Sequence, residues 1–393
     1  MIRQLVTRDS VAVTGSIIGL SSLPFGWLTL KPSRLAAGTS LSLWESVGWD
    51  GAAVIFGLWL VCLALSLTKK GKWRSVILGI TANIILIVTV VFAGLEAGRL
   101  LETEASFARV SPSAGIWVTF AAAYILIFAA RQGLSNSPVW RHLISWSGLA
   151  AIFILLLTGW LNNLSIVQEF IGREARFRQE LLQHVFLFGG SVTVGTLLGI
   201  PLGIWAARSK RAEKPIFYFA NITQTIPSLA LFGLLIAPLS ALSFAFPVLR
   251  EFGIRGVGPT PAIIALIIYS LLPIVRNTFV GLRQLDPAVI DAGLGMGMSR
   301  PQVFRRLEVP LAAPLVLEGV RTASVQSVGL AAVAALIGAG GLGWFVFQGL
   351  GQAAPDLIIL GAIPIIGLAL VVDATMRTFV RLATPKGLAG GEA

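Results

Sequence analysis

Apolar runs of close to twenty residues recur along the chain, and short segments between them hold most of its charges. A helix of that length crosses the roughly 30 Å hydrocarbon core of a bilayer. The runs are uninterrupted and do not alternate with polar residues, so they predict helices and not the strands of a barrel. We predict ten spans, at residues 11–30, 49–67, 75–95, 113–130, 142–161, 183–207, 215–238, 259–282, 311–337 and 356–376.

The composition agrees with an all-α polytopic membrane protein. Of 393 residues, 55% are hydrophobic and 12% are charged, whereas a soluble domain carries about twice that charged fraction. The only cysteine, Cys62, lies inside an apolar run, and the two histidines, His142 and His184, are far apart. We therefore expect no disulfide and no metal site.

The net charge of +12 follows the topology of the chain and does not indicate a nucleic-acid partner. The connectors on one side of the ten spans hold 19 basic and 6 acidic residues, and those on the other side hold 9 basic and 10 acidic ones. The positive-inside rule then predicts both termini in the cytoplasm of a bacterial plasma membrane. Arg3 and Arg8 precede an apolar run that is long for a signal peptide, so we expect a retained first helix.

The two halves of the chain differ in their loops and in the motifs that they contain. Residues 1–161 form five spans with short loops and no recognisable motif. Residues 162–182 are polar and nearly neutral, and they predict an external amphipathic connector. Residues 183–393 form five further spans, with a long cytoplasmic connector at residues 286–310.

That connector predicts two short helices outside the bilayer. Asp286 before Pro287 is a typical helix start, and three following glycines, the last of them Gly297, permit a sharp reversal. Ser299 is suited to cap a second helix, which we expect to end at Pro310.

The connector resembles the signature E-A-A-x3-G-x9-I-x-L-P of ABC importer permeases, with complete spacing and four mild substitutions. In that family this loop docks into a cleft of a cytoplasmic ATPase and transmits its closure. The resemblance implies that Arg305 and Arg306 are available to acidic groups on the ATPase. It assigns the rest of the coupling loop to Asp291, Ala292, Gly293, Gly297, Leu307 and Pro310, with Ala292 and Gly293 at the contact and Gly297 at the turn.

Residues 222–233, 269–278 and 337–343 resemble the osmoprotectant branch of these permeases, which imports glycine betaine, proline betaine, choline and related quaternary amines. The resemblance covers about the C-terminal half and implies a type I importer core. The first five spans resemble the extra region of some long members. The resemblance further implies a second permease copy or homologous permease, cytoplasmic ATPases and an external or periplasmic solute-binding protein as partners.

The chain itself is not expected to be an enzyme. It contains no G-x-x-x-x-G-K-[ST] sequence, so ATP must be bound by a partner subunit and we expect no cofactor on this chain. The string Gly338-x-Gly340-x-x-Gly343 follows a membrane helix instead of a strand, and predicts a tight turn or close packing near the external mouth, and not a dinucleotide site.

Polar residues within the spans are candidates for the translocation pathway. A proline-broken step in the seventh span exposes backbone carbonyls, which is tolerated at membrane depth only beside protein or a cavity. Aromatic rings could face a quaternary ammonium group, although such residues more often form interfacial belts. The candidates are Gln224, Thr225, Pro227, Ser228, Tyr269, Arg276 and Asn277, with Tyr218 and Phe219 as further aromatic residues.

Other polar and small residues predict packing. Gly195, Gly199 and Gly203 form one face of a span and favour helix packing within the subunit over a dimer seam. Glu318 with Arg321, and Asp373 with Arg377, are spaced as ion pairs.

Two alternatives remain open. The chain could be a permease for another small solute such as an amino acid. It could also be a secondary transporter built from five-plus-five inverted repeats. Against this alternative, the sequences of the two halves show no similarity to each other, and the connector at 286–310 has no counterpart near 131–141.

Overall fold

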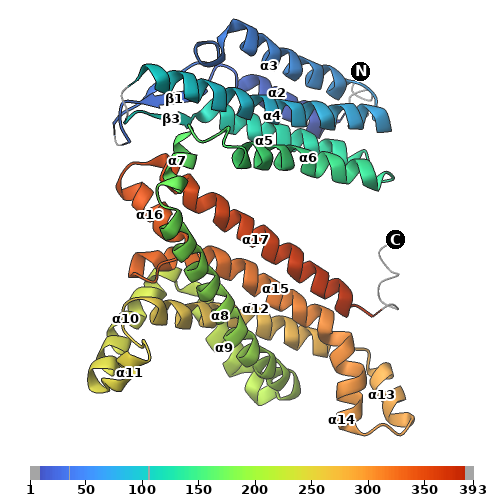
Figure 1. The fold of residues 1–393 in the computed structure, drawn as a ribbon. Coiled ribbons are helices and arrows are strands. Elements are labelled where there is room, and N and C mark those ends of the chain that lie inside the picture. Colours follow the sequence, from blue (N-terminus) through green and yellow to red (C-terminus); the bar gives the residue numbers. More distant parts are fainter. Residues whose placement is uncertain (1–8, 35, 105–106, 386–393) are drawn as a thin grey trace. The chain divides into compact units, whose positions relative to one another are not determined.

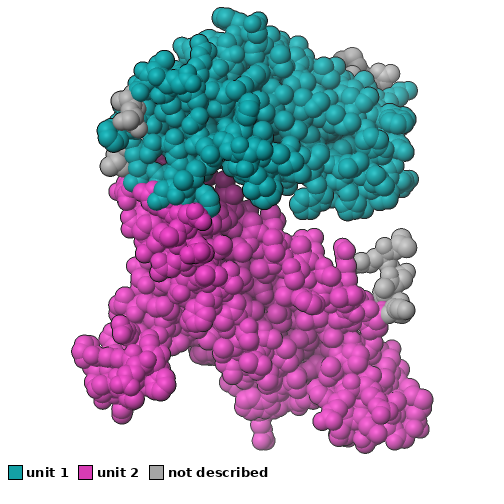
Figure 2. Space-filling view, in the orientation of Figure 1, with its two compact units in different colours: residues 1–172 teal, residues 173–393 magenta. Residues whose placement is uncertain are grey.

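The computed structural model describes residues 9–34, 36–104 and 107–385, which are mostly helical (Figure 1). Among these residues, nine helices are long and apolar enough to cross a membrane, which confirms the predicted fold class. The chain divides into two compact units, unit 1 up to Gly172 and unit 2 from Arg173 onward (Figure 2). Of the charged residues used for the topology prediction, Arg3, Arg8, Lys386 and Glu392 lie outside the described residues.

Unit 1 is a helical bundle with a small antiparallel sheet of order β2–β1–β3. In the sheet, Leu28 of the central strand faces Leu41 on one side and Pro112 on the other. The elements are α2 (Ser10–Ser21), β1 (Leu28–Lys31), β2 (Thr39–Leu41), α3 (Leu43–Leu67), α4 (Lys72–Thr103), β3 (Arg109–Pro112), α5 (Ala114–Gln132), α6 (Pro138–Leu157) and α7 (Ser165–Ile171).

The first apolar segment differs from the predicted span at residues 11–30. Its helix, α2, ends at Ser21, and the segment finishes as strand β1. Pro24 lacks the backbone N–H that a continuing helix would need, and the strand pairs with two neighbours instead. At 1.5 Å per residue, α2 covers only about 18 Å.

A buried ion pair joins the start of α2 to α4. The Asp9 carboxylate accepts a hydrogen bond from the Arg74 guanidinium at 2.7 Å and one from the Ala12 amide at 3.4 Å. Arg74 also donates to the Leu65 carbonyl at 3.0 Å, near the end of α3. Because a buried charge is costly without a partner, this pair fixes the three helices at one end of unit 1.

Unit 2 is built around α12, which packs against both α8 and α15. A π-helical turn (Phe304–Glu308) precedes α15, and a 3-10 turn (Ala334–Ile337) follows it. The helices are α8 (Glu174–Arg208), α9 (Lys210–Thr225), α10 (Ser228–Ala245), α11 (Val248–Glu251), α12 (Pro259–Arg283), α13 (Pro287–Gly295), α14 (Arg300–Val303), α15 (Val309–Val333), α16 (Gly343–Gly351) and α17 (Pro355–Ala383).

The predicted external connector at residues 162–182 takes a different form. One part is α7 of unit 1, and residues 174–182 are the first turns of α8, continuous with the following span. Glu180 is buried there and accepts a hydrogen bond from the Gly341 amide at 2.6 Å. This part of the segment is therefore continuous with the following helix, with Glu180 buried and most of its other residues exposed.

The three spaced glycines of α8 form its contact with α12. A Cβ atom on Gly203 would lie 2.6 Å from the Thr278 Cβ and 2.8 Å from the Val275 carbonyl oxygen. Gly195 and Gly199 meet Ser270 and the Ile274 side chain at similarly short range. Small residues thus bring the two backbones together, and the prediction of packing within the subunit is confirmed.

The two charged pairs predicted in the last spans join into one network between α15 and α17. Arg321 contacts both Glu318 oxygens at 2.9 Å and an Asp373 oxygen at 2.6 Å. Arg377 also pairs with Asp373. Two acids and two arginines neutralise one another, which lowers the cost of placing charge within membrane-spanning helices.

The close contact between the three glycines of α8 and α12 leads to a direct prediction. Gly203→Leu should lower the free energy of unfolding by about 1–3 kcal/mol, because the new side chain must displace α12 backbone and Thr278. Thermal unfolding of the purified protein measures this effect. Gly189→Leu, on the same helix at a site where an added Cβ atom would meet no neighbouring group within 4 Å, should leave the melting temperature nearly unchanged. Equal melting temperatures for the two variants would contradict the close packing.

Candidate functional site

The connector at residues 286–310 begins with the predicted capped helix. The Asp286 carboxylate accepts a hydrogen bond from the Ala288 amide at 2.9 Å, and Pro287 occupies the first turn of α13. The side chain thereby satisfies one of the free amides at the helix start. The start of α13 is therefore set by its own sequence.

A tight reversal follows α13. The Met298 amide donates to the Gly293 carbonyl at 3.1 Å, and the Gly297 amide donates to the Leu294 carbonyl at 2.9 Å. Gly297 has φ = +84°, a left-handed conformation that glycine adopts without a Cβ penalty. The reversal therefore depends on glycine at this position.

The second helix starts as predicted but does not end as predicted. The Ser299 amide donates to the Gln302 side chain at 2.7 Å, which closes a capping box at α14. The expected end at Pro310 is wrong, because Pro310 lies in the first turn of α15. The intervening π-helical turn, in which the Val309 amide bonds to the Phe304 carbonyl five residues earlier, admits a residue without an N–H while the helix continues.

The connector presents a small apolar face. Ala292 is exposed on α13, together with Val289, Leu294 and Met296, of which Met296 is 72% exposed. Methionine adapts readily to an irregular partner surface. Val289 and Leu294 were not among the residues expected from sequence; Val289 shares the face of Ala292 and Met296 at helical spacing, whereas Leu294 points to another side of α13.

The remaining residues of the connector divide between its surface and its interior. Asp291, Gly297, Arg305, Arg306 and Pro310 are exposed. Gly293 is buried, and a Cβ atom on it would lie 2.6 Å from the Leu307 Cδ1. Gly293 and Leu307 therefore hold α13 against the π-helical turn and do not belong to the exposed face.

An ion pair that sequence did not predict ties the connector to α8. The Arg208 guanidinium at the end of α8 pairs with the buried Glu308 carboxylate of the π-helical turn. Arg208 and Glu308 are one hundred residues apart in the sequence. Taken alone, each is typical of the charged residues found at the ends of membrane spans. Nothing in their spacing could have joined them.

The second candidate region is the break between α9 and α10. The predicted span at residues 215–238 is two helices, joined by extended backbone at Ile226 and Pro227. Gln224 donates to the Tyr269 carbonyl at 2.7 Å. That carbonyl lacks its usual helical partner because residue 273 is a proline. The Tyr269 hydroxyl in turn donates to the Ile226 carbonyl at the break.

Three helices meet at this polar cluster. Gln326 of α15 donates to the Gln224 side chain at 3.5 Å, so α9, α12 and α15 all contribute. Thr225 and Pro227 are exposed beside it and Ser228 is half-buried. Gln326 was not expected from sequence, where it is one polar residue among several in its span.

Arg276 and Asn277 lie elsewhere. They follow Tyr269 by seven and eight residues on α12, or about 10 Å along the helix axis. Arg276 is exposed, and the Asn277 side chain donates to the Pro273 carbonyl of its own helix at 2.8 Å. They are therefore separate from the Gln224 cluster.

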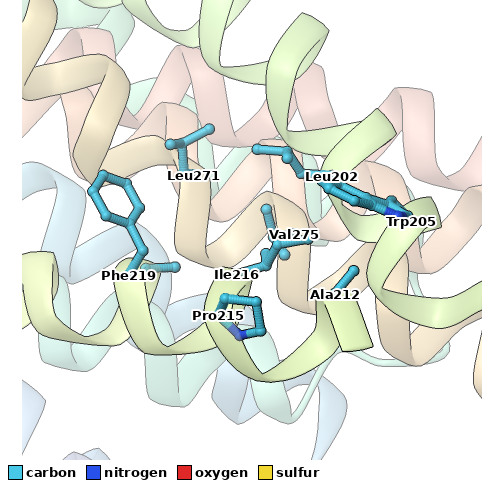
Figure 3. A pocket seen from close by; sticks show the side chains of 9 residues that line it. Leu202, Trp205, Ala212, Pro215, Ile216, Phe219, Leu271 and Val275 are labelled. Carbon is cyan, nitrogen blue, oxygen red and sulfur yellow. The ribbon is translucent and has the colours of Figure 1, made fainter. Parts of the chain in front are cut away.

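The aromatic residues do not form a cage. Tyr269 is buried and its hydroxyl is bonded, whereas Tyr218 and Phe219 are exposed. Phe219 instead borders an apolar cavity of about 290 Å³ between α8, α9 and α12 (Figure 3). The lining is almost entirely apolar and suits a hydrocarbon chain better than a polar solute. It consists of Leu202, Trp205, Ala212, Pro215, Ile216, Phe219, Ala220, Leu271 and Val275.

The glycine-rich string after α15 is a tight turn, as predicted. Gly338, Gly340 and Gly341 all have positive φ. Gln183 of α8 donates to the Ala339 carbonyl at 3.0 Å, beside the Glu180–Gly341 bond. The first turns of α8 thus hold this turn in place.

Two family models match the chain in adjacent regions. Residues 199–384 match the binding-protein-dependent transport system inner membrane component. Residues 7–167 match the N-terminal domain of the ABC transporter permease YehY. The first match contains the connector and the Gln224 cluster, and the second falls within unit 1.

Individual relatives and one solved structure are similar to about half of the chain. The glycine betaine/carnitine/choline transport system permease protein OpuCB of Bacillus subtilis (strain 168) is 38% identical over 53% of this chain and 88% of its own length. The osmoprotectant import permease protein OsmW of Salmonella typhimurium (strain LT2) is 39% identical over 52% of this chain and 91% of its own length. An inward facing structure of the MetNI methionine ABC transporter covers 54% of this chain and 98% of its own, at 20% identity and a TM-score of 0.47.

The Gln224 cluster leads to the next prediction. Gln224→Leu should lower the free energy of unfolding by roughly 1–2 kcal/mol, because it leaves the Tyr269 carbonyl without a donor. Asn221→Leu, an exposed site one turn earlier on the same helix, is the matched control. The comparison of melting temperatures in lipid nanodiscs measures the difference, and equal values would remove the structural role of this hydrogen bond.

Proposed function

This chain belongs to the permeases of binding-protein-dependent ABC importers, in the long form with an N-terminal extension, and we propose that its solute is a quaternary amine such as glycine betaine or choline. The proposal of the solute class rests on relatives whose names specify these compounds. An importer of another small solute, such as an amino acid, remains the second candidate for the same membrane subunit.

The observation that carries the mechanism is the capped helix α13, whose small apolar face is exposed at the tip of a rigid reversal. An exposed apolar face on a short polar loop favours burial by a partner. We propose that a cytoplasmic ATPase binds this face at Ala292 and Met296, with Arg305 and Arg306 meeting acidic groups at its edge.

The orientation of the chain follows from this role. The multi-pass permease lies in the inner membrane, and an ATPase and a solute-binding protein are its partners. We propose that the connector and both termini face the cytoplasm, in agreement with the basic residues of the alternate connectors. A second permease, identical or homologous, would complete the pathway, and the solute-binding protein would deliver the solute from the outside.

We further propose that the break between α9 and α10 borders the pathway. It is a place where a membrane-spanning segment carries non-helical backbone, exposed polar residues and glutamines from two helices together. Such backbone is stable at membrane depth beside protein or an aqueous cavity. Arg276 and Asn277 would lie along the same route, nearer the cytoplasm.

The division of labour between the units is also a proposal. The relatives align over 206 to 208 residues that make up 88% to 91% of their own lengths, which leaves too little of them for a counterpart of unit 1. This supports residues 183–393 as the transport core and residues 1–161 as an addition. The inverted-repeat alternative loses support, since the two halves match different family models.

Substitutions on the exposed face test the docking proposal. Ala292→Lys places a long charge on the apolar face, and Gly297→Asp adds a side chain where φ is positive. Both should reduce uptake of labelled glycine betaine or choline at least tenfold and release the ATPase on purification. Ala292→Ser keeps the face small and should retain both properties. Normal uptake in both disruptive variants, at normal membrane levels, would refute the docking role.

A truncation tests the assignment of the core. A chain lacking residues 1–161 should still retain the ATPase on affinity purification, because the proposed docking face and its supports lie in unit 2. Detergent-stable monodispersity of the truncated chain is the control for folding. A folded, truncated permease that no longer binds the ATPase would refute the assignment.

A further inference from the structure

Arg208 contacts both ends of the π-helical turn that carries the connector. Its guanidinium pairs with Glu308, the last residue of the turn. The central carbon of this guanidinium lies 5.4 Å from the centre of the aromatic ring of Phe304, which is the first residue of the turn. A planar guanidinium can make a carboxylate contact and a ring contact together, which a lysine ammonium does less well.

The acid in this pair is buried and the arginine is not. The Glu308 side chain is 8% exposed, whereas the Arg208 side chain is 52% exposed. A buried carboxylate requires a partner to remain charged. Arg208 supplies that partner from another helix, so the pair fixes the position of the turn relative to α8.

The proposed docking face is coupled to this turn by packing. Gly293 of α13 leaves room for the Leu307 side chain, which a Cβ atom at 293 would meet at 2.6 Å. Leu307 directly precedes Glu308 in the turn. A displacement of α13 must therefore displace the turn, and with it the acid that Arg208 holds.

An apolar pocket also borders the turn. An apolar cavity of about 250 Å³ lies there, bordered by Phe304 and Val309 on one side and by Ile200 and Ile204 of α8 on the other. The residues of the turn and of α8 that line this pocket are apolar and supply no polar contact between the two there. The Arg208–Glu308 pair is thus a polar link between the turn and α8, beside this apolar pocket.

The part of α8 that precedes Arg208 is packed closely against the rest of unit 2. Its three glycines hold it against α12, and Glu180 at its other end binds the turn after α15. A displacement that reaches the end of α8 is therefore passed to the helices around the proposed pathway.

We propose that Arg208 is a positioning residue that transmits displacement of the ATPase-docking helix α13 to α8 through its contacts with Glu308 and Phe304. This inference rests on the proposed docking role of the connector. It adds a second route to the covalent one along α15. The pair is not part of the docking face, so its loss should uncouple hydrolysis from transport without releasing the ATPase.

The test uses the complete importer reconstituted in proteoliposomes: permease, ATPase and solute-binding protein, with labelled glycine betaine or choline as solute. Two quantities are measured, the ATPase retained per permease and the solute transported per ATP hydrolysed. Arg208→Gln should keep the ATPase and lower the transport-to-hydrolysis ratio at least tenfold. Arg208→Lys should lower it less, because the charge remains while the ring contact is weakened.

Two further variants complete the design. Arg211→Gln removes the same charge from an exposed arginine that makes no ion pair among the described residues, and should leave the ratio unchanged. The pair Arg208→Met with Glu308→Leu leaves no unpaired buried charge, so the permease can fold, and its ratio should also fall at least tenfold.

The outcomes separate the two proposals. A wild-type ratio in Arg208→Gln, or in the apolar pair, would overturn the role of Arg208 while the docking proposal stands. Release of the ATPase by Arg208→Gln would also overturn it, because that result would make Arg208 a docking residue. Full ATPase retention by Ala292→Lys would instead refute the docking proposal and this inference with it.

Discussion

The constraint on which this structure depends is that backbone polar groups within a bilayer must find partners inside the protein. Where a helix is interrupted, a side chain from another helix completes the hydrogen bonds. Gln224 bonds the carbonyl that Pro273 leaves free, and the Tyr269 hydroxyl bonds the carbonyl at the break before α10. At the turn after α15, Glu180 binds the Gly341 amide. Each interruption is therefore also a junction between helices.

Hydrogen bonds and backbone conformation also set the shape of the connector at residues 286–310. Its first helix is capped by Asp286, its reversal is set by Gly297, and its second helix is capped by Ser299. These devices are local and hold the connector in one shape. Its attachment to the membrane helices is different in kind, since it relies on the packing of Leu307 and the buried charge of Glu308.

Much of the architecture followed from the order of residues. Long apolar runs predicted nearly all of the spans, and the spacing of Gly195, Gly199 and Gly203 predicted a close helix contact. Two predicted helix ends were wrong because the effect of a proline on the helix was misjudged. Pro24 ends the first apolar segment as a helix earlier than expected, whereas Pro310 does not end one, because the π-helical turn before it accommodates the missing N–H.

The sequence by itself determined what depends on neighbours along the chain: the helical spans, the caps at Asp286 and Ser299, the reversal at Gly297 and the family of the chain. Periodicity and capping act over a few residues, so they can be read without a fold. The tertiary structure alone decided which distant groups meet. Gln224 finds Tyr269 and Gln326, and Arg208 finds Glu308, because helices remote in sequence pack side by side. Such pairings arise from the packing of whole helix faces, which no local pattern specifies.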